Sequence, residues 1–167
     1  MSQPTPSPET KALLAYLNAQ REHVLGILEG LDNEALRRSI LPSGWTALGL
    51  VQHLALDVER FWFRAIVAGE QVDLAAGGDA WQVGAEVPSG AILDRYRQEI
   101  AHANAIIAAT PPDTAPAWWP VGLFGDWRLH TVRQIILHGM AETACHAGHL
   151  DAARELIDGR KWLVLTD

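Results

Sequence analysis

The chain has 167 residues, of which 49% are hydrophobic and 20% charged, and 13 lysines and arginines against 20 aspartates and glutamates give a net charge of −7. A chain of this length can bury a sizeable core without disulfides, so we expect one domain over residues 1–167. The negative charge and the lack of a basic stripe argue against nucleic-acid binding. Cys145 is the only cysteine, which excludes an internal disulfide and is compatible with the reducing cytoplasm.

The first half of the chain is predicted to contain two long helices and a short one. Residues 1–8 carry several prolines and predict a flexible lead-in that lacks the pattern of a secretory signal. Apolar residues recur at three- and four-residue steps over residues 9–31, which predicts a helix. Residues 32–40 predict a short turn-like helix that ends at a Pro–Gly segment. Thr46 is a suitable N-cap for a long helix that continues to about Ala68.

The segments that follow predict a crossover, a third helix and an aromatic loop. Residues 69–88 are rich in glycine and long for a connection between helices, which permits a crossover to the far end of a bundle. Ser89 is expected to cap a helix that runs to about Ala109 and stops at a pair of prolines. Residues 111–130 place tryptophans and a phenylalanine among prolines and glycines. A loop with so much aromatic surface is expected to fold back onto the helices.

The last long helix is predicted from its capping signals. Thr131 and Gln134 have the spacing of a capping box, and the apolar pattern continues to about Ile157 before Gly159 supplies a stop. Four long helices with one long middle connection predict an all-α four-helix bundle in which the second and third helices run roughly parallel. No apolar run approaches the roughly 18 to 20 residues that would span a bilayer, so we expect no membrane segment.

A stripe of polar side chains lies on the predicted last helix. His138, Glu142, His146 and His149 are separated by steps of four, four and three residues, which places them on one helix face within about 80°. Apolar residues flank the stripe, so part of it is expected to point toward the interior. Buried histidine and glutamate side chains need partners.

The stripe predicts a metal site. Glu142 and His146 are four residues apart and can reach one ion from the same side, as paired ligands on a helix do for zinc. His53 is the best third ligand, because it lies among apolar neighbours on the second helix, and Gly49 one turn earlier lets another element approach closely. A lone histidine is more often an ordinary core or boundary residue, and the stripe on the last helix is what favours a ligand here.

Several neighbouring side chains leave alternatives open. His149 can replace Glu142 as a ligand, and both His138 and His149 can instead support the ligands or form a solvated face. Asp57 can orient His53, although an exposed acid on the outer face is the simpler interpretation. Cys145 is expected to pack as a small apolar group rather than act as a nucleophile. The remaining histidines are expected at the surface: His23, His102 and His130.

The motifs resemble the DinB-like superfamily, near its mycothiol-dependent maleylpyruvate isomerase branch. The resemblance rests on residues 43–46 (SGWT), residues 50–62 (LVQHLALDVERFW) and residues 131–159, and it covers most of the chain. It implies a four-helix bundle of up-down-down-up topology with a metal held by His53, Glu142 and His146. The isomerase branch has glutamate at the position of Glu142, as here, where many other members have histidine.

The resemblance also implies a chemistry. We expect zinc or nickel to activate mycothiol or another low-molecular-weight thiol for thiol transfer or a thiol-dependent isomerisation of a small-molecule substrate. The substrate pocket is expected between the second and last helices, with Trp62, Trp119 and Trp127 in its walls. A homodimer is a further expectation from the family.

Two other functions stay open on the sequence. One is a metal-dependent hydrolase, in which His138 or His149 moves protons. The other is a module without catalysis, in which the metal staples the bundle or an apolar face pairs two chains.

Overall fold

The computed structural model describes residues 5–74 and 79–162. These residues form helices, and the prediction of an all-α bundle is confirmed. In chain order the helices are α1 (Pro8–Ile27), α2 (Asn33–Arg37), α3 (Ala47–His53), η1 (Leu54–Val67), η2 (Asp79–Trp81), α4 (Ser89–Ala109) and α5 (Val132–Asp158).

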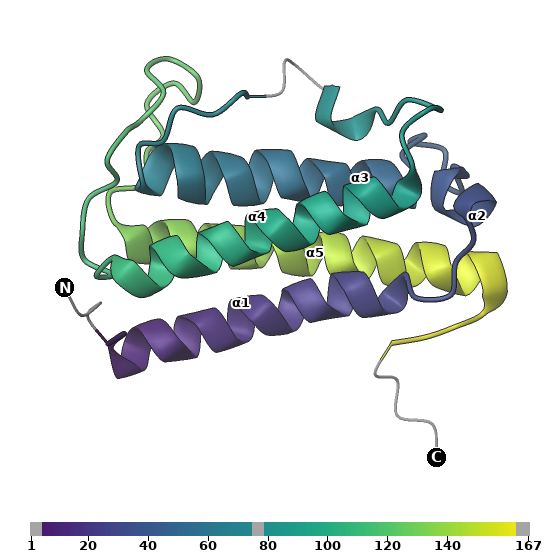
Figure 1. Cartoon of the computed structure of the whole chain (residues 1–167), viewed down its shortest axis with the longest axis horizontal. Coiled ribbons are helices and arrows are strands. Elements are labelled where there is room, and N and C mark those ends of the chain that lie inside the picture. Colours follow the sequence, from purple (N-terminus) through teal and green to yellow (C-terminus); the bar gives the residue numbers. More distant parts are fainter. Residues whose placement is uncertain (1–4, 75–78, 163–167) are drawn as a thin grey trace.

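The long helices lie side by side and run in two opposite directions (Figure 1). The helices α1 and α5 run one way, whereas α4 and the continuous pair of α3 and η1 run the opposite way. The helix α1 packs mainly on α5, and η1 packs mainly on α4. Two consecutive parallel helices need a connection that returns along the whole bundle, which is why the segment between η1 and α4 is long.

The second long helix changes its winding at His53. Thr46 caps it as predicted, since its side chain accepts a hydrogen bond from the amide of Gly49 at 3.0 Å. From Leu54 the helix continues as the π-helix η1, and at its end Ala68 N–H donates to the carbonyl of Phe63, five residues earlier, at 3.1 Å. Apolar periodicity located the end of this helix but not its wider winding, which is rare and frequently marks functional sites.

Two helix starts differ from the sequence prediction. Ser7 caps α1 and Pro8 is its first residue, so this part of the predicted lead-in is ordered, whereas residues 1–4 lie outside the described part. Ser89 does not cap α4: it is the first helical residue, and its hydroxyl donates to the side-chain oxygen of Asn33. The prediction for Ser89 was wrong because a tertiary partner competes for the hydroxyl.

The last helix has the predicted ends. Thr131 Oγ1 accepts from the amide of Gln134 at 3.3 Å, and Gln134 Oε1 accepts from the amide of Thr131 at 3.2 Å. These two bonds form the capping box. Gly159 ends the helix with a φ of 77°, a left-handed conformation that favours glycine.

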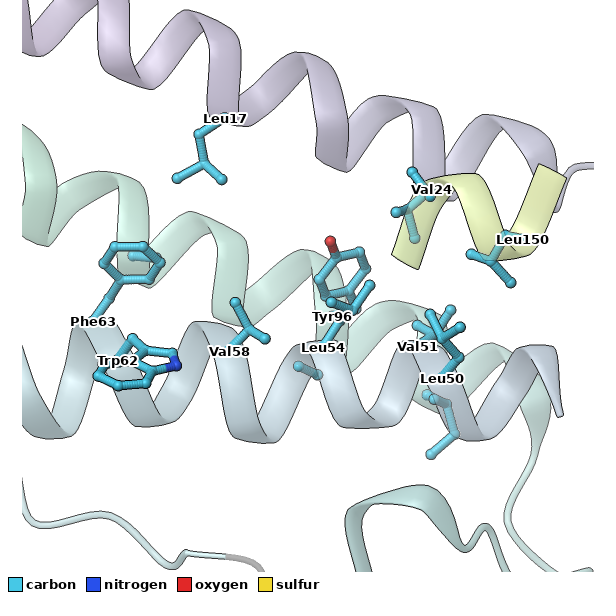
Figure 2. Packing of buried hydrophobic residues seen from close by; sticks show 14 of the residues in the cluster. Leu17, Val24, Leu50, Val51, Leu54, Val58, Trp62, Phe63, Tyr96 and Leu150 are labelled. Carbon is cyan, nitrogen blue, oxygen red and sulfur yellow. The ribbon is translucent and has the colours of Figure 1, made fainter. Parts of the chain in front are cut away.

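The buried side chains of the long helices form one continuous core. Figure 2 shows Leu54, Val58 and Phe63 pointing from the second long helix toward α1 and α4, where they lie near Leu17 and Tyr96. This core holds the bundle together and sets the spacing between the second long helix and α5.

Among the described residues, no helix combines the length and apolar character that crossing a membrane requires.

The aromatic loop before α5 folds back onto the bundle, as predicted. The amide of Trp118 donates to the carbonyl of Ile66 at 3.1 Å, which ties the loop to the end of η1. The ring of Phe124 stacks on that of Trp62, with centroids 5.6 Å apart. The tip of the loop stays in solvent, since Val121 is 99% exposed.

Candidate metal centre

Three potential ligands from two distant helices converge. His53 is the last residue of α3, and Glu142 and His146 lie on α5. One ligand atom from each side chain lies within 4.8 Å of the other two. The rings of His53 and His146 are 5.0 Å apart, and Glu142 Oε2 lies 3.7 Å from His146 Nε2. The structure thus brings together the three residues that the sequence selected.

Asp57 orients the ring of His53. Its Oδ2 lies 2.8 Å from His53 Nδ1, and the His53 side chain is only 15% exposed. A proton on Nδ1 leaves Nε2 with a free lone pair, the form in which histidine binds a metal. The simpler interpretation of Asp57 as an outward-facing acid was wrong, because an i,i+4 step returns its side chain to the face that carries His53.

Trp81 covers the other side of His53. The two rings stack with centroids 4.2 Å apart and an angle of 18°, and the indole also meets His146 edge-on at 5.7 Å. Gly49 makes this approach feasible, since a Cβ there would lie 2.4 Å from the carbonyl oxygen of Trp81. The close approach predicted at Gly49 is therefore confirmed, and the approaching element is η2.

The sequence analysis missed Trp81, although a tryptophan in a glycine-rich connection is a signal that the segment packs against something. Gln52 anchors this segment from α3: its side-chain amide donates to the carbonyls of Ala80 and Gln82, at 3.0 and 2.9 Å.

His146 is prepared to act as a ligand by its surroundings. Burial lowers the pKa of His146, the nearby His53 lowers it as well, and the carboxylate of Glu142 opposes both effects, which together leave the pKa at about 4. The imidazole is therefore neutral at neutral pH and offers a lone pair without first losing a proton.

The donor set fits a divalent transition metal. Two imidazoles and one carboxylate are a common ligand set of catalytic zinc sites, which keep an open position for water or substrate. Such ligands lie about 2.0–2.2 Å from zinc, so their donor atoms sit closer together than here. Borderline nitrogen and oxygen donors suit zinc and nickel.

The two outer histidines of the stripe occupy different places. His149 is exposed, and its Nδ1 lies 3.4 Å from His146 Nδ1. Within the described part of the chain it is not among the converging ligand atoms. His138 is half-buried, and its ring meets that of Trp62 edge-on at 4.6 Å.

A cavity of about 440 Å³ opens beside the three converging side chains. Its walls come from the end of α3, η1, α5, the aromatic loop and the segment after η1: His53, Asp57, Val58, Phe61, Trp62, Leu74, Leu123, Phe124, His138 and Glu142. Of the three tryptophans expected in this pocket, Trp62 lines it. Trp119 and Trp127 pack behind the Trp62 ring, with centroids 6.0 and 6.1 Å away, because the loop turns Phe124 toward the cavity instead.

Two further expectations about single residues were wrong. Cys145 is exposed rather than packed, because its side of α5 faces away from the other helices. His23 is half-buried, with Nε2 2.8 Å from Asp151 Oδ1 and its ring stacked on Trp162 at 5.0 Å. His102 and His130 are exposed, as predicted.

Comparison with known proteins identifies the family of the chain. No curated protein sequence matches the chain. A protein-family model described as mycothiol-S-transferase matches residues 12–159, which include both helices of the metal centre. The match spans most of the chain and favours the transferase over the isomerase among the reactions that the motifs implied. The chain therefore belongs to the mycothiol S-transferase family, a member of the DinB-like superfamily.

Proposed function

We propose that this chain transfers a low-molecular-weight thiol, mycothiol or a close analogue, to an electrophilic small molecule with the help of a divalent metal. Zinc or nickel would be held by His53, Glu142 and His146. The observation that carries the proposal is the convergence of these three ligands, two of which, His53 and Glu142, line an aromatic cavity. Membership of the mycothiol S-transferase family supports the choice of thiol.

The metal would supply one effect: it lowers the pKa of a thiol bound to it, so that a thiolate is present at neutral pH. The reaction then forms a bond between the sulfur and an electrophilic carbon while the leaving group departs with its electron pair. The thiol proton goes to a base. We propose His138 as this base, and the proposal is supported by the position of His138 in the cavity wall, one turn before Glu142.

The cavity walls support an apolar acceptor. Phe61, Trp62 and Phe124 offer aromatic surface on which an organic electrophile can pack. Leu123 comes from the tip of the aromatic loop and borders the same space. An acceptor held there meets the sulfur at the His53 and Glu142 side, which is the proximity that a two-substrate transfer needs.

The test is a transfer assay with monobromobimane as a fluorescent electrophile. The zinc-loaded and nickel-loaded chains are each mixed with mycothiol, bacillithiol or glutathione, and the conjugates are identified by mass spectrometry. We expect the mycothiol conjugate to form fastest and its formation to stop with a chelator or in His146→Ala. Absence of any enzyme-dependent conjugate would overturn the proposal, and turnover of esters or amides in thiol-free buffer would replace it with a hydrolase.

The proposed cosubstrate bears on the setting of the protein. Reduced low-molecular-weight thiols are maintained in the cytoplasm, so we propose a cytoplasmic location. The homodimer stays a prediction, which a sedimentation experiment on the purified chain can test.

A further inference from the structure

A second cavity lies on the other side of Trp81. It has a volume of about 400 Å³, and its walls come from α2, the loop before α3 and the segment around η2: Arg37, Ser43, Gly44, Trp45, Thr46, Trp81, Gln82 and Val83. We call it the Trp45–Trp81 cavity.

The Trp45–Trp81 cavity adjoins the metal centre through both tryptophans. One face of Trp81 is stacked on His53, so the rest of the indole separates the cavity from that ligand. The ring of Trp45 lies 6.2 Å from that of His149, one turn beyond His146 on α5. A molecule in this cavity is therefore next to the indole that covers His53 and to the indole that meets the helical turn after His146.

The chemistry of the walls differs from that of the aromatic cavity. Two indoles are combined with hydroxyl groups of Ser43 and Thr46 and with the side-chain amide of Gln82. Hydroxyls and amides both donate and accept hydrogen bonds, which suits a ligand with many hydroxyl groups. Indole surfaces pack on the apolar face of a sugar ring while polar neighbours bind its hydroxyls. This combination is typical of a site for a polyhydroxylated group.

The walls are held in place before any ligand arrives. The Arg37 guanidinium donates to the carbonyls of Gly84 and Val87, which ties α2 to the segment after η2. Gln52 binds the backbone on both sides of Trp81. A preformed site costs less ordering entropy on binding than a mobile one.

We propose that the Trp45–Trp81 cavity binds the sugar-like carrier part of the thiol cosubstrate, while the aromatic cavity holds the electrophile. This inference rests on the proposed function. Mycothiol carries its thiol on an acylated cysteine linked to a sugar and a cyclitol, so the sulfur can lie at the metal centre while the hydroxyl-rich part lies beyond Trp81. The two cavities would then separate the two substrates on either side of the ligands.

The experiment measures binding of the thiol-free carrier, glucosaminyl-inositol, to the zinc-loaded full chain by isothermal titration calorimetry. We expect Trp45→Ala to weaken this binding at least tenfold and Phe61→Ala, a matched aromatic truncation in the other cavity, to leave it unchanged. Gln82→Ala, at an exposed position, is expected to weaken binding severalfold without any effect on folding. Thermal melts of all variants check that the bundle is intact.

Transfer assays separate this inference from the proposed function. With mycothiol as the donor, we expect Trp45→Ala to raise the KM for mycothiol at least tenfold. With N-acetylcysteine, which lacks the carrier, we expect the same variant to leave the KM for N-acetylcysteine unchanged. Equal KM values for mycothiol in Trp45→Ala and the unmodified chain would overturn the inference while the transferase stands. Carrier binding that is lost in Phe61→Ala but kept in Trp45→Ala would also overturn it. Carrier binding that needs Trp45, in a chain without transfer activity, would support the cavity and refute the transferase.

Discussion

Two groups of polar side chains in this bundle, one around Arg21 and Glu59 and the other the metal centre, differ in how their donors and acceptors are matched. In the core between α1 and η1, Arg21 donates to both carboxylate oxygens of Glu59, at 2.7 and 2.5 Å, and its Nη1 donates to the side-chain oxygens of Asn18 and Asn104 at 2.8 Å each. The side chains of Arg21 and Glu59 are no more than 2% exposed. Every contact in this group pairs a donor with an acceptor.

In the metal centre, by contrast, hydrogen-bond acceptors face one another. With the Nδ1–H of His53 donating a hydrogen bond to Asp57, the atoms that converge are imidazole lone pairs and carboxylate oxygens. Partly buried lone pairs that face each other are unfavourable unless a proton or a cation lies between them. A buried polar group whose donors and acceptors match one another stabilises the fold. A group of converging acceptors with no donor among them is suited to bind a cation.

The largest effect on stability is expected in the self-satisfied group. Arg21→Ala leaves the Glu59 carboxylate buried and unpaired, so we expect a loss of about 3–5 kcal/mol in the free energy of unfolding. Replacing both residues together, as Arg21→Met with Glu59→Leu, should recover most of that loss because no charge is stranded. Urea denaturation measures both, and a single-variant loss below about 1 kcal/mol would contradict the contrast between the two groups.

The opposite behaviour is expected at the metal centre. In the metal centre, His146→Ala leaves no proton donor without its acceptor. The free energy of unfolding of the metal-free chain should therefore stay within about 1 kcal/mol of its original value. Zinc at 100 times its Kd should stabilise the unmodified chain by about 2.7 kcal/mol and leave the variant unchanged. Thermal melts with zinc and with a chelator compare the two, and equal stabilisation of both chains would argue against the centre.

A smaller effect is expected from the residue that orients His53. Asp57→Ala should weaken zinc binding about 10–100-fold, because the ring loses the acceptor for its Nδ1 proton. Asp57→Asn should lose less, since its amide oxygen can still accept that proton. Competition titration with a chromophoric chelator measures the affinities, and equal losses in both variants would show that the charge of Asp57 matters rather than its hydrogen bond.

The smallest effect is a pH dependence of the metal-free chain. His146 binds its proton with a pKa of about 4 in the fold, against 6.5 ordinarily, so the unfolded chain takes up the proton first as the pH falls. The contribution of neutral His146 to stability is therefore complete above about pH 6.5 and is lost toward pH 4. The difference between the two pKa values sets an upper limit of about 3 kcal/mol, which solvent screening at this half-buried ring reduces to on the order of 1–2 kcal/mol. Denaturation across this range should show a shallower slope for His146→Ala, and identical slopes would contradict the pKa.

Local signals in the sequence predicted much of the fold. The capping box at Thr131, the cap at Thr46 and the apolar periodicity depend on neighbours within one or two helical turns, and each was confirmed. Glu142 and His146 share a helix face for the same reason. Asp57 shows that the same rule could have revealed more, because its i,i+4 relation to His53 was readable from the spacing.

Other features depend on which faces of the helices meet. Periodicity defines a face of α5 but not its neighbour, so it could not predict that Cys145 lies in solvent or that His23 contacts Asp151. Ser89 was misassigned because its competing partner, Asn33, is distant in the chain. The π-helical winding of η1 has no apolar period of its own to reveal it.

The sequence by itself determined an all-α bundle and the two ligands on its last helix, because helix formation and i,i+4 spacing are local properties of the chain. Only the tertiary structure decided that His53 faces those ligands and that Trp81 covers His53 between two cavities. Those contacts join residues dozens of positions apart, and they form only when core packing brings the helices to one spacing and orientation.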